Sequence, residues 1–208
     1  MVHFILGNHE ILNFHGDHRY NRGKYIKAAQ EISQINDKKE AIKYLYSNQT
    51  ELGKWLATKN VIEKIGDYLF VHGGLSPELL DYELDLSTIN NMVRFRFSGL
   101  KDPNDTLVNF LYSSKGPFWY RGLVMNRYTY SKISLLELEE ILSYYDVQKI
   151  VIGHTPVETI STDFNGKVIK IDVRHGTKSF PGRTKGLLIE NCEEFVIDAY
   201  GTKRRLQY

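Results

Sequence analysis

The chain has 208 residues, of which 42% are hydrophobic and 25% charged, values typical of a globular domain with a substantial core. Its net charge of +2 gives no overall field that favours nucleic acid or an anionic membrane, so neither is an expected partner. Cys192 is the only cysteine, which excludes an intrachain disulfide and a thiolate metal cluster. No apolar run approaches the roughly 20 residues that cross a bilayer. The first residues show no signal peptide, so a cytoplasmic protein is the default expectation, and export stays open if Met1 is not the native start.

The order of apolar and polar residues predicts strands and helices through the first half of the chain. Residues 2–6 are an apolar run that predicts a buried strand, and a glycine turn follows them. Residues 23–46 are charged and favour helix, and a short helix is expected between Thr50 as its cap and Asn60. A hairpin is then predicted around the Gly66-Asp67 turn.

The second half combines helices with further hairpins. Residues 76–115 are expected to be helical in parts, and residues 116–123 to form a loop. Ser134 and Glu137 match a capping box, which predicts a helix starting there. The expected buried stripe of that helix is Leu135, Leu138, Ile141 and Leu142.

The last part of the chain predicts a buried strand in "VQKIVIGHT" and two hairpins, which turn at Asn165-Gly166 and near Asn191. Strands, helices and several hairpins together predict an α/β protein whose sheets are not purely parallel.

Three of the predicted strands end in a turn that carries glycine and histidine. The turns are "LGNHE" with His9, "VHGG" with His72 and "IGHT" with His154. A single histidine after a strand is usually a hydrogen-bonded loop residue, but three such turns indicate a site. Neutral imidazole binds divalent metals, and the side-chain oxygen of Asn8 is a compatible ligand.

These motifs resemble a known family. "GNHE", "VHGGLSP" and "GHT" are similar, in the same order, to three motifs of the calcineurin-like metallophosphoesterases, in their phosphoprotein-phosphatase branch. The longer segments "GNHEILNFHGDHRY", "FVHGGLSPE" and "PFWYRG" resemble the Shewanella-like protein phosphatases most closely. The symmetrical diadenosine tetraphosphatases are a weaker match. The resemblance extends from residue 2 to about residue 175.

The resemblance implies a fold and a reaction. The fold would be α/β, a two-sheet αββα metallophosphatase sandwich, here a single catalytic domain over residues 1–208 with a helical insert at about residues 20–60. The reaction would be metal-dependent hydrolysis of a phosphomonoester by direct attack of metal-bound hydroxide. The implied cofactors are two divalent ions, with manganese, iron or zinc as the expected metals.

The resemblance also implies residue roles. Asn8, His72 and His154 match ligands of the second metal, and His9 matches the histidine that faces the scissile ester. Arg121, in "WYRG", matches an arginine that holds the phosphate, a task that suits its fork of donors.

Other readings of the polar residues stay open. Arg121 could instead cap a loop or pair with a carboxylate. Arg19 and Asp17 match the family wording, and Arg19 is a second candidate for substrate binding, although both residues could simply brace their loop. Asp172 is expected to be structural, and Cys192 to have no catalytic role.

Two motifs of the family are not found ahead of "GNHE". The family carries an Asp-x-His motif and a second aspartate motif there, and only seven residues precede Asn8. We therefore expect a domain that lacks its first β-α-β unit, and little activity from this chain alone. The alternatives are a fragment of a longer phosphatase, a short catalytically inactive binding module, or a site completed by a second chain.

The expected substrate is a phosphorylated protein, dephosphorylated at serine, threonine or tyrosine, or a small phosphoester. The alternative enzyme is a dinucleoside polyphosphate hydrolase. The loops at residues 14–60 and 98–120 would determine which substrate is hydrolysed, but their sequences contain no motif that indicates it.

Overall fold

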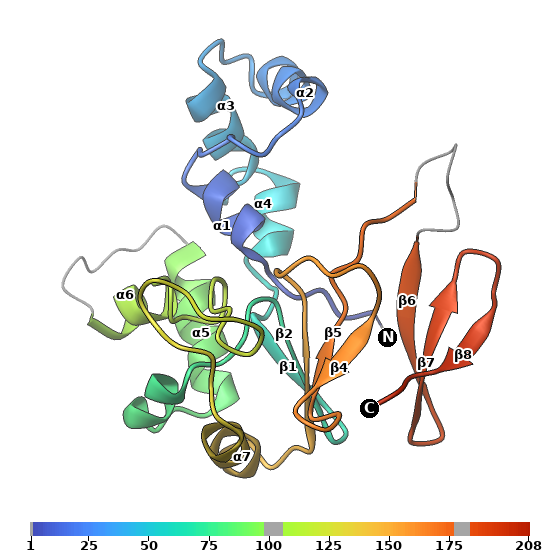
Figure 1. Cartoon of the computed structure of the whole chain (residues 1–208). Helices are drawn as coiled ribbons and strands as arrows, with labels where there is room; N and C mark the ends of the chain where they lie inside the picture. Colours follow the sequence, from blue (N-terminus) through green and yellow to red (C-terminus); the bar gives the residue numbers. More distant parts are fainter. Residues whose placement is uncertain (1, 98–105, 177–183) are drawn as a thin grey trace.

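The computed structural model describes residues 2–97, 106–176 and 184–208 (Figure 1). The helices are α1 (Asn8–Phe14), α2 (Gly23–Ser33), α3 (Lys38–Leu45), α4 (Glu51–Leu56), the 3-10 helix η1 (Pro77–Tyr82), α5 (Leu86–Phe97), α6 (Thr106–Leu111) and α7 (Leu135–Tyr144). The strands are β1 (Ile62–Ile65), β2 (Tyr68–Val71), β3 (Lys149–Ile152), β4 (Ser161–Asp163), β5 (Val168–Lys170), β6 (Lys185–Glu190), β7 (Glu193–Asp198) and β8 (Lys203–Arg205). No helix in the described ranges has the length and apolarity that a membrane crossing requires.

The strands form two sheets, as the α/β prediction requires. The five-stranded sheet has the order β1-β2-β3-β5-β4, and the three-stranded sheet has the order β6-β7-β8. Strands β2, β3 and β5 run parallel at the centre of the larger sheet, and β1 and β4 pair antiparallel at its edges. The prediction of sheets that are not purely parallel is therefore confirmed.

The larger sheet is buried on both faces, which explains the continuous apolar run in β3. Ile150 and Ile152 belong to the main core, together with residues of α5 and α7 such as Ile141. Val151 points to the opposite face and packs in a second core that includes Leu187 of the small sheet. Successive side chains of a strand alternate between faces, so β3 contributes to both cores. Figure 1 shows the helices α5–α7 on one side of the large sheet and β6–β8 on the other.

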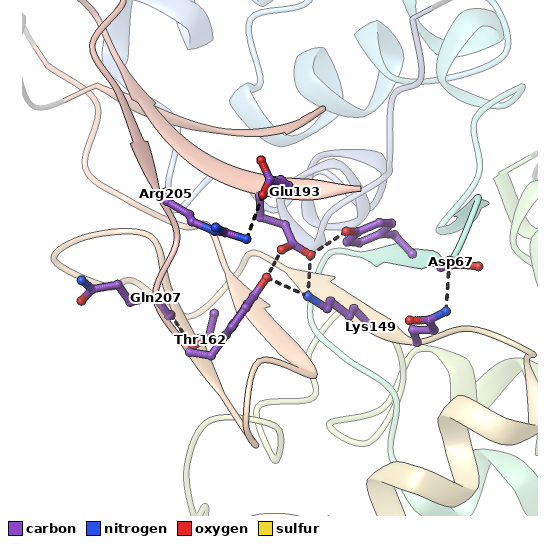
Figure 2. Close-up of polar contacts among 10 residues, drawn as sticks. Asp67, Lys149, Thr162, Glu193, Arg205 and Gln207 are labelled. Atoms are coloured by element: carbon purple, nitrogen blue, oxygen red, sulfur yellow. Dashed lines mark hydrogen bonds and ion pairs between the residues drawn. The ribbon is translucent and has the colours of Figure 1, made fainter. Parts of the chain in front are cut away.

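A buried polar cluster joins the two sheets. Glu194 of β7 is 2% exposed and accepts hydrogen bonds from Tyr68 of β2 at 2.5 Å and from Lys149 of β3 at 2.5 Å. The Tyr208 hydroxyl donates to the same carboxylate. The dashed lines that meet near the labelled Lys149 in Figure 2 mark this cluster. Because it links β2 and β3 of the large sheet to β7 of the small sheet, it fixes how the small sheet sits on the large one.

Several local predictions are confirmed by the structure. The Thr50 side chain accepts a hydrogen bond from the Gly53 amide and caps α4, and Ser134 and Glu137 form the capping box of α7. The hairpins β1–β2, β4–β5 and β6–β7 turn where the sequence indicates, and Asn165 and Asn191 have positive φ angles of 53°.

Other expectations were wrong. Residues 2–6 do not form a strand, because their one ladder contact is an isolated bridge between Ile5 and Asn60, and Val2 is 97% exposed. Helix α4 ends at Leu56, before Asn60. Leu135 lies 40% exposed at the start of α7, so the buried stripe of that helix starts at Leu138.

The strand β8 was not expected, since its residues are all charged and exposed. Part of the loop expected to set specificity, residues 98–105, lies outside the described residues.

Candidate active site

Two of the three glycine–histidine turns meet because their strands are neighbours. Strands β2 and β3 are parallel, and Val71, the last residue of β2, pairs with Ile152, the last residue of β3. His72 therefore follows β2 at the same sheet edge at which His154 follows β3. The Gly153 amide donates to the His72 carbonyl at 2.9 Å, so the ladder continues into the turns and fixes the two histidines relative to each other.

The third turn is held at the same edge by a short backbone contact. The Leu6 amide donates to the Asn60 carbonyl at 2.9 Å, just before β1, which begins where β2 ends. Gly7 leads into α1, and its amide donates to the Glu10 carboxylate at 2.8 Å. The Glu10 carboxylate therefore caps the N-terminus of α1. Asn8, which is buried, is the candidate metal ligand of this turn.

Three side-chain atoms converge on one point. His72 Nε2 lies 2.7 Å from Asn8 Oδ1 and 3.1 Å from His154 Nδ1. Two donors bound to one divalent ion at about 2.0–2.1 Å lie roughly 2.8–3.0 Å apart at octahedral angles and roughly 3.3–3.4 Å apart at tetrahedral angles. The 3.1 Å separation lies between these values and the 2.7 Å separation just below them, so the three atoms are placed to share a single divalent ion after a small shift.

The set holds no carboxylate. In the described part of the chain, no group of three or more histidine, cysteine, aspartate or glutamate side chains is placed to hold a metal ion. The cluster consists of two imidazoles and one amide, all neutral, and hard divalent cations rely on carboxylates for tight binding. These three residues alone are therefore suited to hold one ion weakly.

Both imidazoles are uncharged at neutral pH. Burial lowers the pKa of His72 to about 4, and the charges of His9 and Arg121 add to this effect. Burial, with the charge of Arg121 next in size, lowers the pKa of His154 to about 3. Metal binding requires deprotonated imidazole, so both side chains are held in the form that a metal needs. His154 also adopts a positive φ of 58°, which is uncommon for a non-glycine residue and is found disproportionately at functional sites.

Arg121 reaches the same place from the "WYRG" loop. Its Nη1 atom donates to the His154 carbonyl at 2.8 Å and to the Thr155 hydroxyl at 3.0 Å. Arg121 therefore binds a loop, as the alternative reading proposed, because its Nη1 atom hydrogen-bonds to the turn after β3. Arg121 also lines an open pocket beside the cluster, so the group combines a fixed position with access to a ligand.

His9 lies exposed at the start of α1, next to the pair of buried histidines. Its ring stacks on the ring of Tyr20, with centroids 4.9 Å apart and planes 3° from parallel. Tyr20 in turn lines the pocket. The side chain of the preceding residue, Asn8, contacts His72, so the turn that carries His9 lies at the same sheet edge as the other two glycine–histidine turns. The charge of His9 also contributes to the lowered pKa of His72 and of His154.

The pocket is large and mainly aromatic and basic. Its volume is about 900 Å³, and His154 and Trp119 lie in its wall, with the Trp119 ring edge-on to the imidazole. The other lining residues are Tyr20, Tyr112, Ser114, Arg121, Asn126, Arg127, Tyr128, Thr129 and Tyr130. The segment at residues 126–130 was not singled out from the sequence, since it has neither a motif nor a periodic pattern.

The remaining candidates lie elsewhere. Arg19 is exposed and forms an ion pair with Asp17 at 2.6 Å, and it is not among the residues that line the pocket. Asp172 accepts a backbone hydrogen bond from Val157 and acts on Arg121 only through its charge. Cys192 is exposed in the β6–β7 turn.

Comparison with known proteins identifies the family. The family model of the calcineurin-like phosphoesterases matches residues 1–158. The chain belongs to this family. Because the match ends just after the "GHT" turn, it includes all three glycine–histidine turns and Arg121.

The curated proteins that the chain resembles include one named phosphatase. The chain is 31% identical to Shewanella-like protein phosphatase 1 of Plasmodium berghei over 175 residues, which is 82% of this chain and 46% of the relative. It is 28% identical to an uncharacterized protein of Schizosaccharomyces pombe, covering 81% of this chain and 49% of that protein. The chain thus spans about half the length of the curated relatives it matches.

The fold also matches a solved structure. The cold-active protein-tyrosine phosphatase of a psychrophilic Shewanella species superimposes with a TM-score of 0.82 and 36% identity. The match covers 100% of this chain and 59% of the other. The two-sheet α/β architecture is therefore the metallophosphatase fold.

Proposed function

We propose that this chain carries part of the active site of a metal-dependent phosphomonoesterase that removes phosphate from protein side chains. The observation that carries the proposal is the convergence of Asn8, His72 and His154 within 3.1 Å contacts, directly beside an arginine-lined pocket. Family membership makes phosphoester hydrolysis the expected chemistry of such a site.

Each polar group has a distinct task in this proposal. Asn8 Oδ1, His72 Nε2 and His154 Nδ1 would hold a divalent ion. When bound there, such an ion would act as a Lewis acid on the phosphoryl group and would activate water for attack. Arg121, fixed through one nitrogen to the turn after β3, presents its remaining donors to the phosphoryl oxygens and balances their charge. A ring nitrogen of His9 supplies the proton for the departing oxygen.

Phosphotyrosine is the substrate that we favour over phosphoserine and phosphothreonine. The pocket beside Arg121 contains Trp119, Tyr20 and Tyr128, and its volume of about 900 Å³ is enough for an aromatic side chain. A stacked aromatic pair contributes about 0.5–1.5 kcal/mol beyond the burial of its area. The name of the Shewanella enzyme, a protein-tyrosine phosphatase at 36% identity, points the same way.

The experiment compares three substrates under the same conditions. The full-length natural protein, including any sequence that precedes Met1, is assayed with manganese on a phosphotyrosine peptide, the matched phosphoserine peptide and diadenosine tetraphosphate. We expect the highest kcat/KM on the phosphotyrosine peptide and loss of turnover with EDTA. A clear preference for the dinucleotide, or turnover that survives EDTA, would refute the proposal.

Two variants test the residue roles. His154→Ala removes a ligand, and we expect turnover to fall at least about a hundredfold because the ion would keep only two protein ligands. Cys192→Ser is the control, since a phosphatase that forms a cysteinyl-phosphate intermediate would lose all activity. Full activity of Cys192→Ser is the expected outcome, because Cys192 lies exposed in a turn of the small sheet.

A further inference from the structure

A second arginine faces the pocket, and neither the metal-ligand cluster nor the phosphate-holding role of Arg121 uses it. Arg127 lines the same cavity as Arg121, on an exposed segment that forms one rim of the pocket. Its guanidinium makes no hydrogen bond or ion pair with any residue in the described ranges. No aspartate or glutamate lies among the lining residues. Two cations thus face one cavity without a counter-charge from the pocket.

The position of Arg127 relative to Arg121 is fixed by the backbone. The Arg127 amide donates to the Tyr130 carbonyl at 2.8 Å, and the Arg121 amide donates to the Tyr130 hydroxyl at 3.0 Å. The Tyr130 ring packs on Tyr120, which is 2% exposed. Tyr130 therefore anchors both arginine-bearing segments to the core, and Arg127 is held at a set place on the rim.

The two arginines differ in depth. Arg121 is half-buried against His154, whereas Arg127 is exposed and is followed by Tyr128, whose side chain is fully exposed. A cavity of about 900 Å³ exceeds what one phosphoryl group needs, since sites of about 300–1,000 Å³ hold drug-sized ligands. The pocket thus has room at its rim for a part of a substrate beyond a phosphoryl group.

The two cations also act on each other. Burial, followed by the charge of Arg127, lowers the pKa of Arg121 from its ordinary value. Like charges that face one cavity repel, so an anion that binds between them is attracted by both.

Resting on the proposed phosphatase function, we propose that Arg127 is a specificity-determining residue that binds an acidic side chain next to the phosphorylated residue of a protein substrate. The substrates are then acidic phosphopeptides, whose phosphate lies against Arg121 and whose neighbouring carboxylate lies against Arg127.

The test uses two peptides that differ only in charge. Both carry a non-hydrolysable phosphonate analogue of phosphotyrosine, flanked by Asp and Glu in one and by Asn and Gln in the other. Their Kd values for the manganese-loaded protein are measured by fluorescence anisotropy, and kcat/KM is measured for the matching phosphopeptides and for an aryl phosphate. We expect wild-type protein to prefer the acidic peptide about five- to tenfold, a preference that shrinks at high salt.

Substitutions at Arg127 separate the possible roles. Arg127→Gln abolishes the preference, Arg127→Glu reverses it, and Arg127→Lys restores most of it, while turnover of the aryl phosphate stays within about twofold of wild type. The matched control is Arg204→Gln, an exposed arginine of β8 outside this pocket, which leaves the preference intact.

Four results overturn the inference. Wild-type protein could bind both peptides equally or bind neither. Arg127→Gln could weaken both peptides alike and slow the aryl phosphate, which would assign Arg127 to the phosphoryl group. Arg204→Gln could remove the preference as well, which would make it a general charge effect. Failure of the proposed phosphatase function would give a different result. No phosphoester would then be hydrolysed in the presence of metal, but wild-type protein would still prefer the acidic peptide and Arg127→Gln would still lack that preference.

Discussion

Replacement of Glu194 by alanine tests how the two sheets are held together. Glu194 is the buried acceptor of the inter-sheet cluster in Figure 2, and its hydrogen bonds come from Tyr68, Lys149 and Tyr208. Burial alone would raise the pKa of Glu194, but these hydrogen bonds outweigh burial and hold the pKa below its ordinary value. The carboxylate is therefore charged in the folded protein and contributes stability that is present above about pH 4.5.

The expected cost follows from what the substitution leaves behind. Removal of one partner from a buried ion pair costs about 3–5 kcal/mol, because the other charge stays buried without compensation. The Lys149 side chain is 21% exposed, so water recovers part of this loss. We expect Glu194→Ala to lower the free energy of unfolding by about 3 kcal/mol, a large part of the roughly 5–15 kcal/mol that stabilises a typical domain.

Urea denaturation followed by circular dichroism measures this change. With a slope of about 2 kcal/mol per molar, the midpoint of unfolding should fall by roughly 1–2 M. Glu193→Ala is the matched control, since its ion pair with Arg205, at 2.8 Å, lies at the surface and is worth about 0–1 kcal/mol. A Glu194→Ala variant that loses no more stability than the Glu193→Ala control would refute the reasoning.

Three further predictions concern the site. In Gly7→Ala the new Cβ would lie 2.9 Å from the His72 ring and displace this expected ligand. Calorimetry should therefore show about tenfold weaker manganese binding. The control is Gly23→Ala, which should bind manganese normally because nothing lies within 4 Å of its new Cβ. Arg121→Lys loses the fork geometry and should reduce kcat/KM on an aryl phosphate at least about tenfold, and an unchanged value would remove Arg121 from phosphate binding. The lowered pKa values of His72 and His154 mean that metal-free protein has their full stabilising contribution above about pH 6.5. The unfolding midpoint in EDTA should therefore fall as the pH drops from 7 to 5, and a flat profile would contradict this.

The local elements could be read from the sequence because their signals are local. The capping box of Ser134 and Glu137 satisfies helix amides within one turn, and Asn165 and Asn191 supply the positive φ angles of their hairpin turns. The same reasoning failed for residues 2–6. A strand exists only where a partner pairs along its length, and these residues find one such contact, at Asn60.

The candidate site was predicted only in part. The three turns could be singled out because each follows an apolar run, and the resemblance to the metallophosphoesterases implied Asn8, His72 and His154 as the ligands within them. The pocket beside them was not foreseen. Tyr20 and Arg127 come from loops without periodicity, and their place at the site depends on long-range contacts such as the packing of Tyr130 on Tyr120.

The arrangement of the site follows from the backbone more than from the side chains. His72 belongs to the β2–β3 ladder through its carbonyl, so its distance from His154 depends on the register of the two strands. Arg121 donates to the His154 carbonyl, which ties the expected phosphate-holding group to the backbone of an expected metal ligand. A shift of the turn at residues 153–155 would therefore move ligand and guanidinium together and preserve their separation. For a reaction in which ion and arginine must act on the same phosphoryl group, this separation matters more than the position of either group alone.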